Sequence, residues 1–245
     1  MPLSIALRVE KLSYTYPDGV VALHEVSFEV REEETVGIVG RNGAGKSTLL
    51  LHLNGVLTGT GRIEVLGQAL SPQTLAQVRR DVGLVFQNPD DQLFMPTVYE
   101  DVAFGPMNAG LGDDEVRRRV DEALAAVGMT GFGDRPPHHL SIGQKKRVAI
   151  ATVLVMSPRV IVFDEPMGAL DPVGQEQILQ LLEALPVAKI IATHDLELAR
   201  RLCDRLLVLD AGKVVADRRA DEILSDDELL RAHGLRPCLP PAARC

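Results

Sequence analysis

The sequence predicts an α/β fold in which a mostly parallel sheet lies behind a small antiparallel β layer and carries an inserted helical segment. Short, dense apolar runs are typical of strands that are buried on both faces of a parallel sheet. They recur at 35–40, 82–86, 160–163 and 189–193. Helical patterns separate the runs, and capping residues precede three of them at Ser71, Asp171 and Asp195. Such alternation builds a parallel sheet with helices on its faces.

The N-terminal layer is predicted from apolar residues that repeat with a period of two. They alternate at Ile5, Leu7 and Val9 and again at Val26, Phe28 and Val30. The turn signal Pro17-Asp18-Gly19 lies between the two segments, so we expect an antiparallel pair there. A second hairpin is predicted at 206–216, where the sequence reads LLVLDAGKVVA.

A helical insertion is predicted over 90–156. Apolar residues on one helical face, followed by a glycine at the end of the helix, support it. They are Val116, Val120, Ala123 and Val127, with Gly128 as the stop. We therefore expect one domain over 1–245. In this interpretation 1–89 and 157–217 form the sheet core with its antiparallel layer, 90–156 forms a helical subdomain, and 218–245 is a tail on the surface.

Composition limits the classes of function. The chain has 245 residues, 46% hydrophobic and 24% charged, as in a globular protein. Its net charge of -8 argues against nucleic acid as a partner, because phosphate binding needs a basic surface. Apolar stretches fall short of the ~20 residues of a membrane span and no signal-peptide core is recognised, so we expect a cytoplasmic chain. Cys203, Cys238 and Cys245 are expected to be reduced thiols.

The segment GRNGAGKST at 40–48 predicts a phosphate-binding loop. Its spacing is Gly-x-x-x-x-Gly-Lys-Ser, and it lies between an apolar strand and an apolar helix, as this motif requires. The glycines would let backbone N–H groups surround phosphate oxygens, Lys46 would reach the β- and γ-phosphates, and the Ser47 hydroxyl would bind Mg²⁺. The residues expected to contact ATP are Gly40, Asn42, Gly43, Ala44, Gly45, Lys46, Ser47 and Thr48.

Two carboxylates follow the apolar run at 160–163. Asp164 and Glu165 stand where a strand of an open parallel sheet ends, and such sheets bind ligands at that edge. We expect Asp164 to hold Mg²⁺ through water and Glu165 to orient and deprotonate an attacking water. A carboxylate directed at water favours hydrolysis of the nucleotide over transfer of its phosphoryl group to another acceptor.

The stretch LSIGQ at 140–144 predicts a helix that begins at a binding surface. Ser141 and Gln144 have the spacing of a capping box, which explains the start of the helix. Gly143 is left unexplained, since glycine costs about 1 kcal/mol relative to alanine in a helix and indicates the close approach of another group. That group should be an anion, because the first helical turn presents unpaired N–H groups and a partial positive charge.

Together these three motifs closely resemble the nucleotide-binding subunits of the ATP-binding cassette (ABC) family, over nearly the whole chain. The resemblance implies a P-loop NTPase with a RecA-like sheet. Gln87 matches the family's Q-loop, Asp171 its D-loop and His194 its switch histidine. Tyr16 is the implied aromatic contact of adenine, with Tyr14 as its competitor. The implied Mg²⁺ ligands are Ser47, Gln87 and Asp164, and the implied catalytic residues are Lys46, Gln87, Glu165 and His194.

The family's arrangement also implies a dimer with a second ABC ATPase. Two cassettes, as a homodimer or a heterodimer, would close head to tail, with each ATP between one P-loop and the other subunit's signature helix. The residues implied to contact the partner's ATP are Ser141, Gly143, Gln144 and Asp171. The anion that approaches Gly143 would then be that ATP's γ-phosphate. Two stretches depart from the family pattern, namely Ile142 in the signature and the run Met167-Gly168-Ala169.

One segment discriminates among ABC proteins. The stretch 87–111 and the sequence QKKRVAIA resemble the ATPases of energy-coupling factor (ECF) importers, especially the cobalt and nickel group. This resemblance implies an integral membrane scaffold (T component), a separate substrate-binding membrane subunit, and a peripheral position on the cytoplasmic face of the membrane. Phe94, Met95 and Val98 are candidate contacts of the scaffold, and ordinary core packing is the alternative.

Other classes of ABC protein stay open as alternatives. One is the ATPase of another ABC transporter, importing vitamins or amino acids or exporting its substrate, and the other is a soluble ABC ATPase without a transport role. The basic run Lys145-Lys146-Arg147 is expected to form a solvated helix face and not a nucleic-acid patch. His138 and His139 are expected in a loop.

Overall fold

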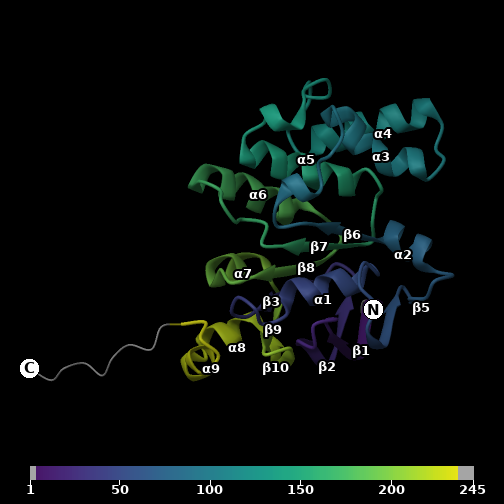
Figure 1. Cartoon of the computed structure of the whole chain (residues 1–245). Helices are drawn as coiled ribbons and strands as arrows, with labels where there is room; N and C mark the ends of the chain where they lie inside the picture. The colour runs from purple at the N-terminus through teal and green to yellow at the C-terminus, as the bar shows by residue number, and fades with distance from the viewer. Residues whose placement is uncertain (1–3, 237–245) are drawn as a thin grey trace, which may run out of the picture.

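The structure, a computed structural model, describes residues 4–236, and these residues form the predicted α/β fold (Figure 1). The larger sheet has the strand order β10-β9-β3-β8-β7-β6, with parallel pairing from β9 to β6 and an antiparallel edge strand. Its strands are β3 (Thr35–Val39), β6 (Val82–Val85), β7 (Val160–Asp164), β8 (Ala188–Thr193), β9 (Arg205–Asp210) and β10 (Lys213–Arg219). The four dense apolar runs and the 206–216 hairpin are thereby confirmed.

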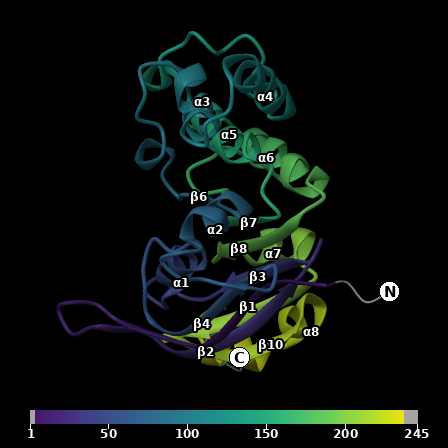
Figure 2. The ribbon, with the colours of Figure 1, turned by 90° about the vertical axis from the view of Figure 1, so that its right-hand side faces the viewer.

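The predicted antiparallel layer is a second sheet with the order β2-β1-β4-β5. Its strands are β1 (Ile5–Thr15), β2 (Val21–Arg31), β4 (Thr60–Val65) and β5 (Gln68–Ala69). Helix α1 (Lys46–Leu53) packs between the two sheets, where Leu49, Leu50 and Leu53 are buried in one cluster with residues of both (Figure 2). This cluster fixes α1, and with it the loop that precedes the helix, against the sheet.

The predicted helical insertion forms the upper part of the molecule in Figure 1. Its main helices are α3 (Val98–Asn108), α4 (Asp113–Ala126) and α5 (Ile142–Leu154), joined by the short 3₁₀ helix η2 (Pro137–His139), and another 3₁₀ helix, η1 (Pro89–Asp91), precedes them. Val116, Val120 and Ala123 are buried, which confirms the apolar face of α4. His138 and His139 lie in η2 and not in an open loop.

Two of the three helix starts predicted from capping residues are confirmed. Asp171 caps α6 (Pro172–Ala184), and Asp195 caps α7 (Leu196–Leu202). The prediction for Ser71 is wrong, because α2 (Leu75–Asp81) begins after Thr74. The Thr74 hydroxyl accepts the Ser71 N–H at 2.9 Å and donates to the Ala69 carbonyl at 2.7 Å, so a closed turn separates Ser71 from the helix.

The C-terminal tail was expected on the surface, and for its described part that expectation is wrong. Strand β10 continues to Arg219 and is followed by α8 (Ala220–Ser225) and α9 (Asp227–Ala232). Ile223 and Leu230 are fully buried in a cluster with residues of β3, α7 and β9. The apolar residues of the tail therefore complete the core at one end of the sheet. Cys238 and Cys245 lie outside the described residues, whereas Cys203 is a buried free thiol whose pKa burial raises to about 12.

None of the helices within residues 4–236 has the length and apolar character that crossing a bilayer requires.

Candidate active site

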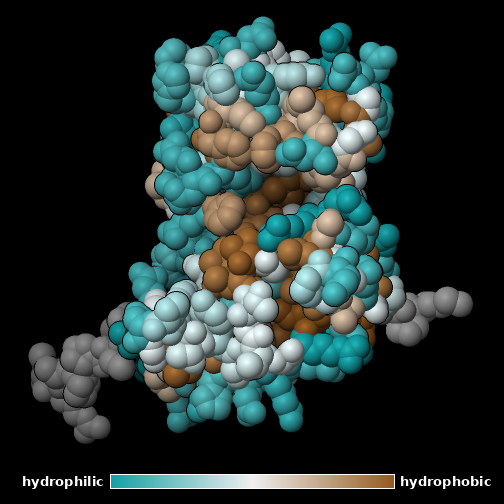
Figure 3. All heavy atoms as spheres, turned by 45° about the vertical axis from the view of Figure 1, so that its right-hand side comes forward, coloured by the Kyte–Doolittle hydropathy of each residue, from teal (hydrophilic) through white to brown (hydrophobic). Residues whose placement is uncertain are grey.

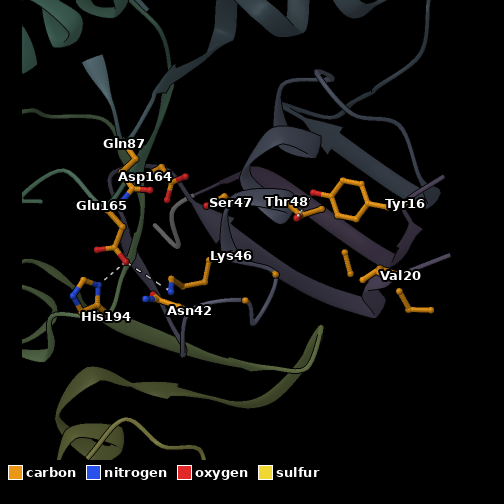
Figure 4. Close-up of a pocket in the computed structure, with 14 residues that line it drawn as sticks. Tyr16, Val20, Asn42, Lys46, Ser47, Thr48, Gln87, Asp164, Glu165 and His194 are labelled. Atoms are coloured by element: carbon orange, nitrogen blue, oxygen red, sulfur yellow. Dashed lines mark hydrogen bonds and ion pairs between the residues drawn. The ribbon is translucent and has the colours of Figure 1, made fainter. Parts of the chain in front are cut away.

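A cavity of about 500 Å³ opens at the carboxyl ends of β3 and β7 and collects most of the residues singled out by their motifs (Figure 4). It is lined by Tyr16, Val20, Val21, Ala22, Asn42, Gly43, Gly45, Lys46, Ser47, Thr48, Gln87, Asp164, Glu165 and His194. The adjacent strands β3, β8 and β7 end together in the parallel sheet, so the segments that follow them meet at one edge. This is the ligand-binding edge of an open α/β sheet.

The glycines of the phosphate loop serve two purposes. Gly43 and Gly45 have φ values of 80° and 105°, in the region that glycine adopts at low cost, and both line the cavity. Gly45 is also the N-cap of α1 and provides no side-chain hydrogen bond, so the first turn of α1 faces the cavity uncapped. Gly40 does not line the cavity. A Cβ atom there would lie 2.3 Å from the Leu209 carbonyl oxygen, so close packing against β9 accounts for this glycine.

The Lys46 ammonium group lies within the loop and close to the predicted base. Its Nζ donates to the Gly40 carbonyl at 2.8 Å and to the Arg41 carbonyl at 3.3 Å. The same Nζ is 3.7 Å from Oε1 of Glu165, in a pair whose members are both buried. Figure 4 shows the lysine directed across the cavity at this carboxylate. A cation at this place can neutralise charge that develops between the loop and Glu165.

The Glu165 carboxylate is held by Thr193, the last residue of β8, and by His194, which follows the strand. Its Oε1 is 2.8 Å from Nδ1 of His194, and its Oε2 accepts the Thr193 hydroxyl at 3.1 Å. Glu165 itself has a φ of 44°, a value that costs free energy for a residue other than glycine. The exposed ring of His194 and the buried carboxylate are thus fixed in one network, as the dashed line in Figure 4 shows.

Asp164 has the features of a group that binds a cation. Its pKa is raised, chiefly because burial disfavours the charged form, while the Ser47 hydroxyl bonded to it acts in the opposite direction. Its Oδ1 is buried and has no hydrogen-bond partner among the described residues. An unpaired carboxylate oxygen next to a serine hydroxyl, with the Gln87 amide lining the same cavity, is an oxygen donor set that fits Mg²⁺.

The two tyrosines near the loop are distinguished by their contacts. Tyr16 lines the cavity, and its hydroxyl is 2.8 Å from the Thr48 hydroxyl, whereas Tyr14 does not line it. The Tyr14 ring instead packs edge-on against His52, with ring centres 4.7 Å apart. The geometry therefore favours Tyr16 for the adenine contact.

The signature residues lie away from this cavity. Ser141, Gly143 and Gln144 form the start of α5, and neither they nor Asp171 line the cavity. The capping box is confirmed: the Ser141 hydroxyl accepts the Gln144 N–H at 3.3 Å, and the Gln144 side chain accepts the Ser141 N–H at 3.0 Å. A Cβ on Gly143 would meet nothing closer than Leu170 at 3.6 Å, an ordinary contact. Within the described residues, packing does not explain this glycine.

The expectation of a solvated basic face after the signature is wrong for Lys146. Lys145 is partly buried, with 16% of its side chain exposed, and pairs with Asp90, whereas Lys146 is only 4% exposed. Its Nζ donates to the backbone carbonyls of Gln87 at 3.2 Å, Glu165 at 3.2 Å and Pro166 at 3.0 Å. The run of basic residues does not by itself indicate this burial. What could have indicated it is the position of Lys146 along the helix, which places its side chain on the inner side of α5.

The phosphate loop, the paired carboxylates and the cavity between them define the class of protein as a P-loop nucleotide hydrolase. The sequence profile of the family described as ABC transporter matches residues 23–168. The chain belongs to the ABC transporter family, and as its ATP-binding subunit it hydrolyses ATP.

The relatives narrow this assignment to the energy-coupling factor type. The chain is 50% identical to the energy-coupling factor transporter ATP-binding protein EcfA of Carboxydothermus hydrogenoformans, over 96% of this chain and 88% of that protein. It is 50% identical to the protein of the same name from Methanocaldococcus jannaschii, over 94% of this chain and 85% of that protein. It therefore groups with ATPases of this type.

Solved structures agree with the fold. The structure of cbiO1 from Clostridium perfringens, described as part of the ABC transporter complex cbiONQ, has a TM-score of 0.82 at 42% identity and covers 95% of this chain and 96% of that chain. The ATP-binding cassette MJ0796, a dimer bound to ADP and Pi, has a TM-score of 0.78 at 31% identity and covers 87% of this chain and 98% of that chain.

Proposed function

We propose that the chain is the ATPase of an ECF-type importer for cobalt or nickel ions, and that it drives a transmembrane partner from the cytoplasmic face of the membrane. The similarity to EcfA proteins supports the class of transporter, and the similarity to cbiO1, which is part of a transporter complex, supports a membrane assembly. The observation that carries the proposal is an exposed apolar surface that is bound to the ATPase machinery. We call it the docking surface and define it as Phe94, Phe104 and Met107.

The docking surface lies beyond Gln87 in the sequence, with Phe94 just before α3 and Phe104 and Met107 in α3. Phe94, Phe104 and Met107 are 64%, 42% and 61% exposed, and the rings of the two phenylalanines pack edge-on with centres 5.1 Å apart. Figure 3 shows apolar side chains gathered on the helical part and in the hollow beneath it. Exposed aromatic residues of this kind favour contact with an apolar partner. Of the three scaffold contacts considered from the sequence, Phe94 is exposed, Met95 is partly buried, and Val98 is wrong because it belongs to the core.

Buried polar contacts fix the docking surface to the ATPase. One carboxylate oxygen of Asp101 accepts the N–H groups of Phe94 and Met95, each at 3.0 Å. Gln92 accepts the Phe86 N–H at 3.1 Å and donates to the Ala149 carbonyl of α5 at 2.9 Å. A partner that moves the docking surface would therefore also act on the segment around Gln87 and on α5.

In the proposed hydrolysis, the chain's own residues supply positions and a proton acceptor. The N–H groups of the loop and the Lys46 ammonium bind the β- and γ-phosphates. Glu165 accepts a proton from the attacking water while the water oxygen bonds to the γ-phosphorus and ADP leaves. His194 donates a hydrogen bond to the γ-phosphate and helps to orient Glu165. Mg²⁺ held by Ser47, Gln87 and Asp164 would supply positive charge at the phosphates when it is bound.

We further propose that two copies, or this chain and a related ATPase, close around ATP. The start of α5 would meet the γ-phosphate bound by the partner subunit, which would account for Gly143. Asp171 would contribute from the segment before α6. The exposed position of Ser141 and the dimeric state of the MJ0796 cassette support this arrangement. Loss of the γ-phosphate would remove the ligand that joins the subunits, so hydrolysis would reopen the dimer.

The proposed cargo rests on the resemblance of the stretch 87–111 to the cobalt and nickel group of importers and not on a site in this chain. Among residues 4–236, no cluster of three or more His, Cys, Asp or Glu side chains is arranged to hold a metal ion. The proposal therefore places recognition of cobalt or nickel in a separate membrane subunit, together with an integral scaffold (T component) that contacts the docking surface.

Co-purification from membranes tests the proposal. The wild-type chain with an affinity tag should retain an integral membrane protein in mild detergent, and Phe94→Asp with Phe104→Asp should lose it, because a charge cannot be buried in an apolar contact without a large free-energy cost. Val215→Asp changes an exposed valine on β10 and is the matched control. Disruption of the gene should also lower uptake of ⁵⁷Co²⁺ or ⁶³Ni²⁺ by the cells. Recovery of the wild-type chain without any membrane protein, or unchanged uptake of both ions, would overturn the proposal.

A further inference from the structure

Lys146 occupies a buried position at which three functional segments meet. It lies on the inner side of α5, on the turn that follows the start of the helix. Its three carbonyl partners come from the segment after β6 (Gln87) and from the segment after β7 (Glu165 and Pro166). An ammonium group has three N–H donors, so these contacts use its whole hydrogen-bonding capacity. No other contact is needed to explain the position of this side chain.

The three contacts are to backbone atoms, so Lys146 fixes the course of the chain. The Glu165 carbonyl belongs to a residue with a φ of 44°, a conformation that other contacts must hold. The Gln87 carbonyl belongs to the segment that leads from β6 to η1 and on to the docking surface. Burial lowers the pKa of Lys146, while the carboxylates of Glu165 and Asp164 act against this and favour the charged form. The nearby acidic groups thus help to keep a buried cation at this junction.

We propose that Lys146 is a positioning residue that joins the segment at Gln87, the backbone of Glu165 and helix α5 into one mechanical unit. A displacement of Gln87 by a membrane partner then shifts the base in this subunit and the start of α5, which faces the partner subunit's ATP, at the same time. Lys146 touches neither substrate nor the reacting atoms. This inference rests on the proposed function for the role of α5 in the dimer, and on the ATPase activity for the role of Glu165.

Two variants test the unit, and a second buried lysine is the control. Lys146→Met keeps the length and apolar stem of the side chain but removes all three donors, and Lys146→Gln retains an amide donor on a shorter side chain. Lys189→Met removes a lysine that is 6% exposed, donates to the Leu185 and Val187 carbonyls and does not line the cavity. Both methionine variants lose a buried, carbonyl-bonded ammonium group, so a general loss of stability affects both.

The first measurement separates binding from turnover. In purified full-length protein, Lys146→Met should bind a fluorescent ATP analogue within about twofold of wild type, because the phosphate loop is unchanged. Its kcat should fall at least tenfold. The kcat of Lys146→Gln should lie between those of wild type and Lys146→Met, and Lys189→Met should keep its kcat within about twofold of wild type. Equal losses of kcat in the two methionine variants at matched thermal stability would overturn the inference, as would a raised KM with an unchanged kcat.

The second measurement examines α5 without hydrolysis. In a Glu165→Gln background, size-exclusion chromatography at increasing ATP concentration should show that Lys146→Met needs at least fivefold more ATP to form the dimer, although each subunit binds ATP normally. An unchanged midpoint would overturn the link to α5. Absence of any ATP-dependent dimer in the Glu165→Gln protein itself would instead contradict the proposed function, so the two failures are distinguishable.

Discussion

Helices α1 and α5 both begin beside a glycine, but their first turns are built in opposite ways. Helix α1 begins after Gly45, which has a left-handed conformation and no side-chain cap, and its first turn lines the cavity. Helix α5 begins after Ser141, where a complete capping box satisfies two backbone N–H groups within the chain. Both starts are proposed to meet the same phosphate, from different subunits.

The difference matches the proposed roles of the two helix starts. The start of α1 is a permanent part of the ATP site in its own subunit, and the start of α5 completes the partner subunit's ATP site only while the dimer is closed. The open first turn of α1 leaves its N–H groups for phosphate oxygens, which act as the cap. The capped first turn of α5 keeps its shape when the dimer is open, because a serine cap contributes about 1 kcal/mol. In the proposed dimer the start of α5 has to keep its shape each time the subunits separate, whereas the P-loop is held by packing against β9 within its own subunit.

The strongest test of this comparison uses a variant that binds ATP without hydrolysing it, so that the starts of α1 and α5 stay on one nucleotide. Glu165→Gln removes the proposed base without changing the shape of the side chain, so the ATPase rate should fall at least 10²-fold, in the range that general-base catalysis supplies. ATP binding and ATP-dependent dimer formation should persist. The rate is measured by phosphate release under saturating ATP, and the dimer by size-exclusion chromatography.

Unchanged hydrolysis in the Glu165→Gln protein would show that another group accepts the proton. Thr193→Val is a useful companion, because it removes only the hydroxyl that donates to Oε2 of Glu165. We expect it to reduce the rate by less than the change at Glu165, since His194 still holds the other carboxylate oxygen.

A change at each helix start separates their roles. Ser141→Arg places a bulky side chain at the start of α5 and should abolish dimer formation and lower the ATPase rate at least tenfold, while one subunit alone still binds ATP. Lys46→Ala should weaken ATP binding itself, because the loop loses its cation. Isothermal titration of a non-hydrolysable ATP analogue and analytical ultracentrifugation check the two outcomes. Full activity with normal dimer formation in Ser141→Arg would contradict the proposed arrangement.

The smallest expected effect concerns His52, a histidine of α1 that has no counterpart in α5. Nδ1 of the buried His52 is 2.7 Å from the Thr48 carbonyl, and burial lowers its pKa below the usual 6.5. The unfolded chain then binds more protons than the folded one as pH falls below about 6.5, so the free energy of unfolding should decrease by up to about 1.4 kcal/mol per pH unit through this group.

Urea unfolding of wild type and His52→Gln between pH 7.5 and 5.5 measures this effect. The difference between the two proteins isolates His52 from the buried carboxylates Asp101 and Asp164, whose pKa values are raised by burial. The variant should show the flatter pH dependence. Identical slopes would mean that His52 is not held neutral in the fold.

Much of the fold could be predicted from local sequence patterns, because each of these patterns strongly favours one kind of secondary structure. Dense apolar runs at β3, β7 and β8 are typical of buried strands, and the Ser141–Gln144 spacing is typical of a helix start. The start of α2 was misplaced, because there the local pattern allows more than one structure. Ser71 has the side chain of a cap, but it forms a closed turn with Thr74 before the helix, and the sequence alone does not show that this turn precedes the start of α2.

The candidate site was predictable where a motif specifies atoms, and not where tertiary packing decides. The cavity brings together Lys46, Asp164 and Glu165 because β3 and β7, the strands that carry them to it, both pair in parallel with β8 and end at the same edge of the sheet. Lys146 was missed, since a basic run on a helix gives no indication of which residue points inward. For Val98 the alternative of core packing holds, and the sequence left it open because its burial depends on how α3 packs within the helical part. The roles of the signature residues stay predictions, because they concern a second subunit.

The packing of Gly234 brings the end of the described chain against the phosphate loop. A Cβ there would lie 2.6 Å from Cδ of Arg41, a residue of the phosphate loop, and His233 is 2.8 Å from Asp210 at the end of β9. His233 and Gly234, which do not line the cavity, therefore form part of the packing that supports the phosphate loop. We therefore expect that shortening the protein before α9 changes the affinity for ATP although the cavity itself is untouched, which titration of an ATP analogue would measure.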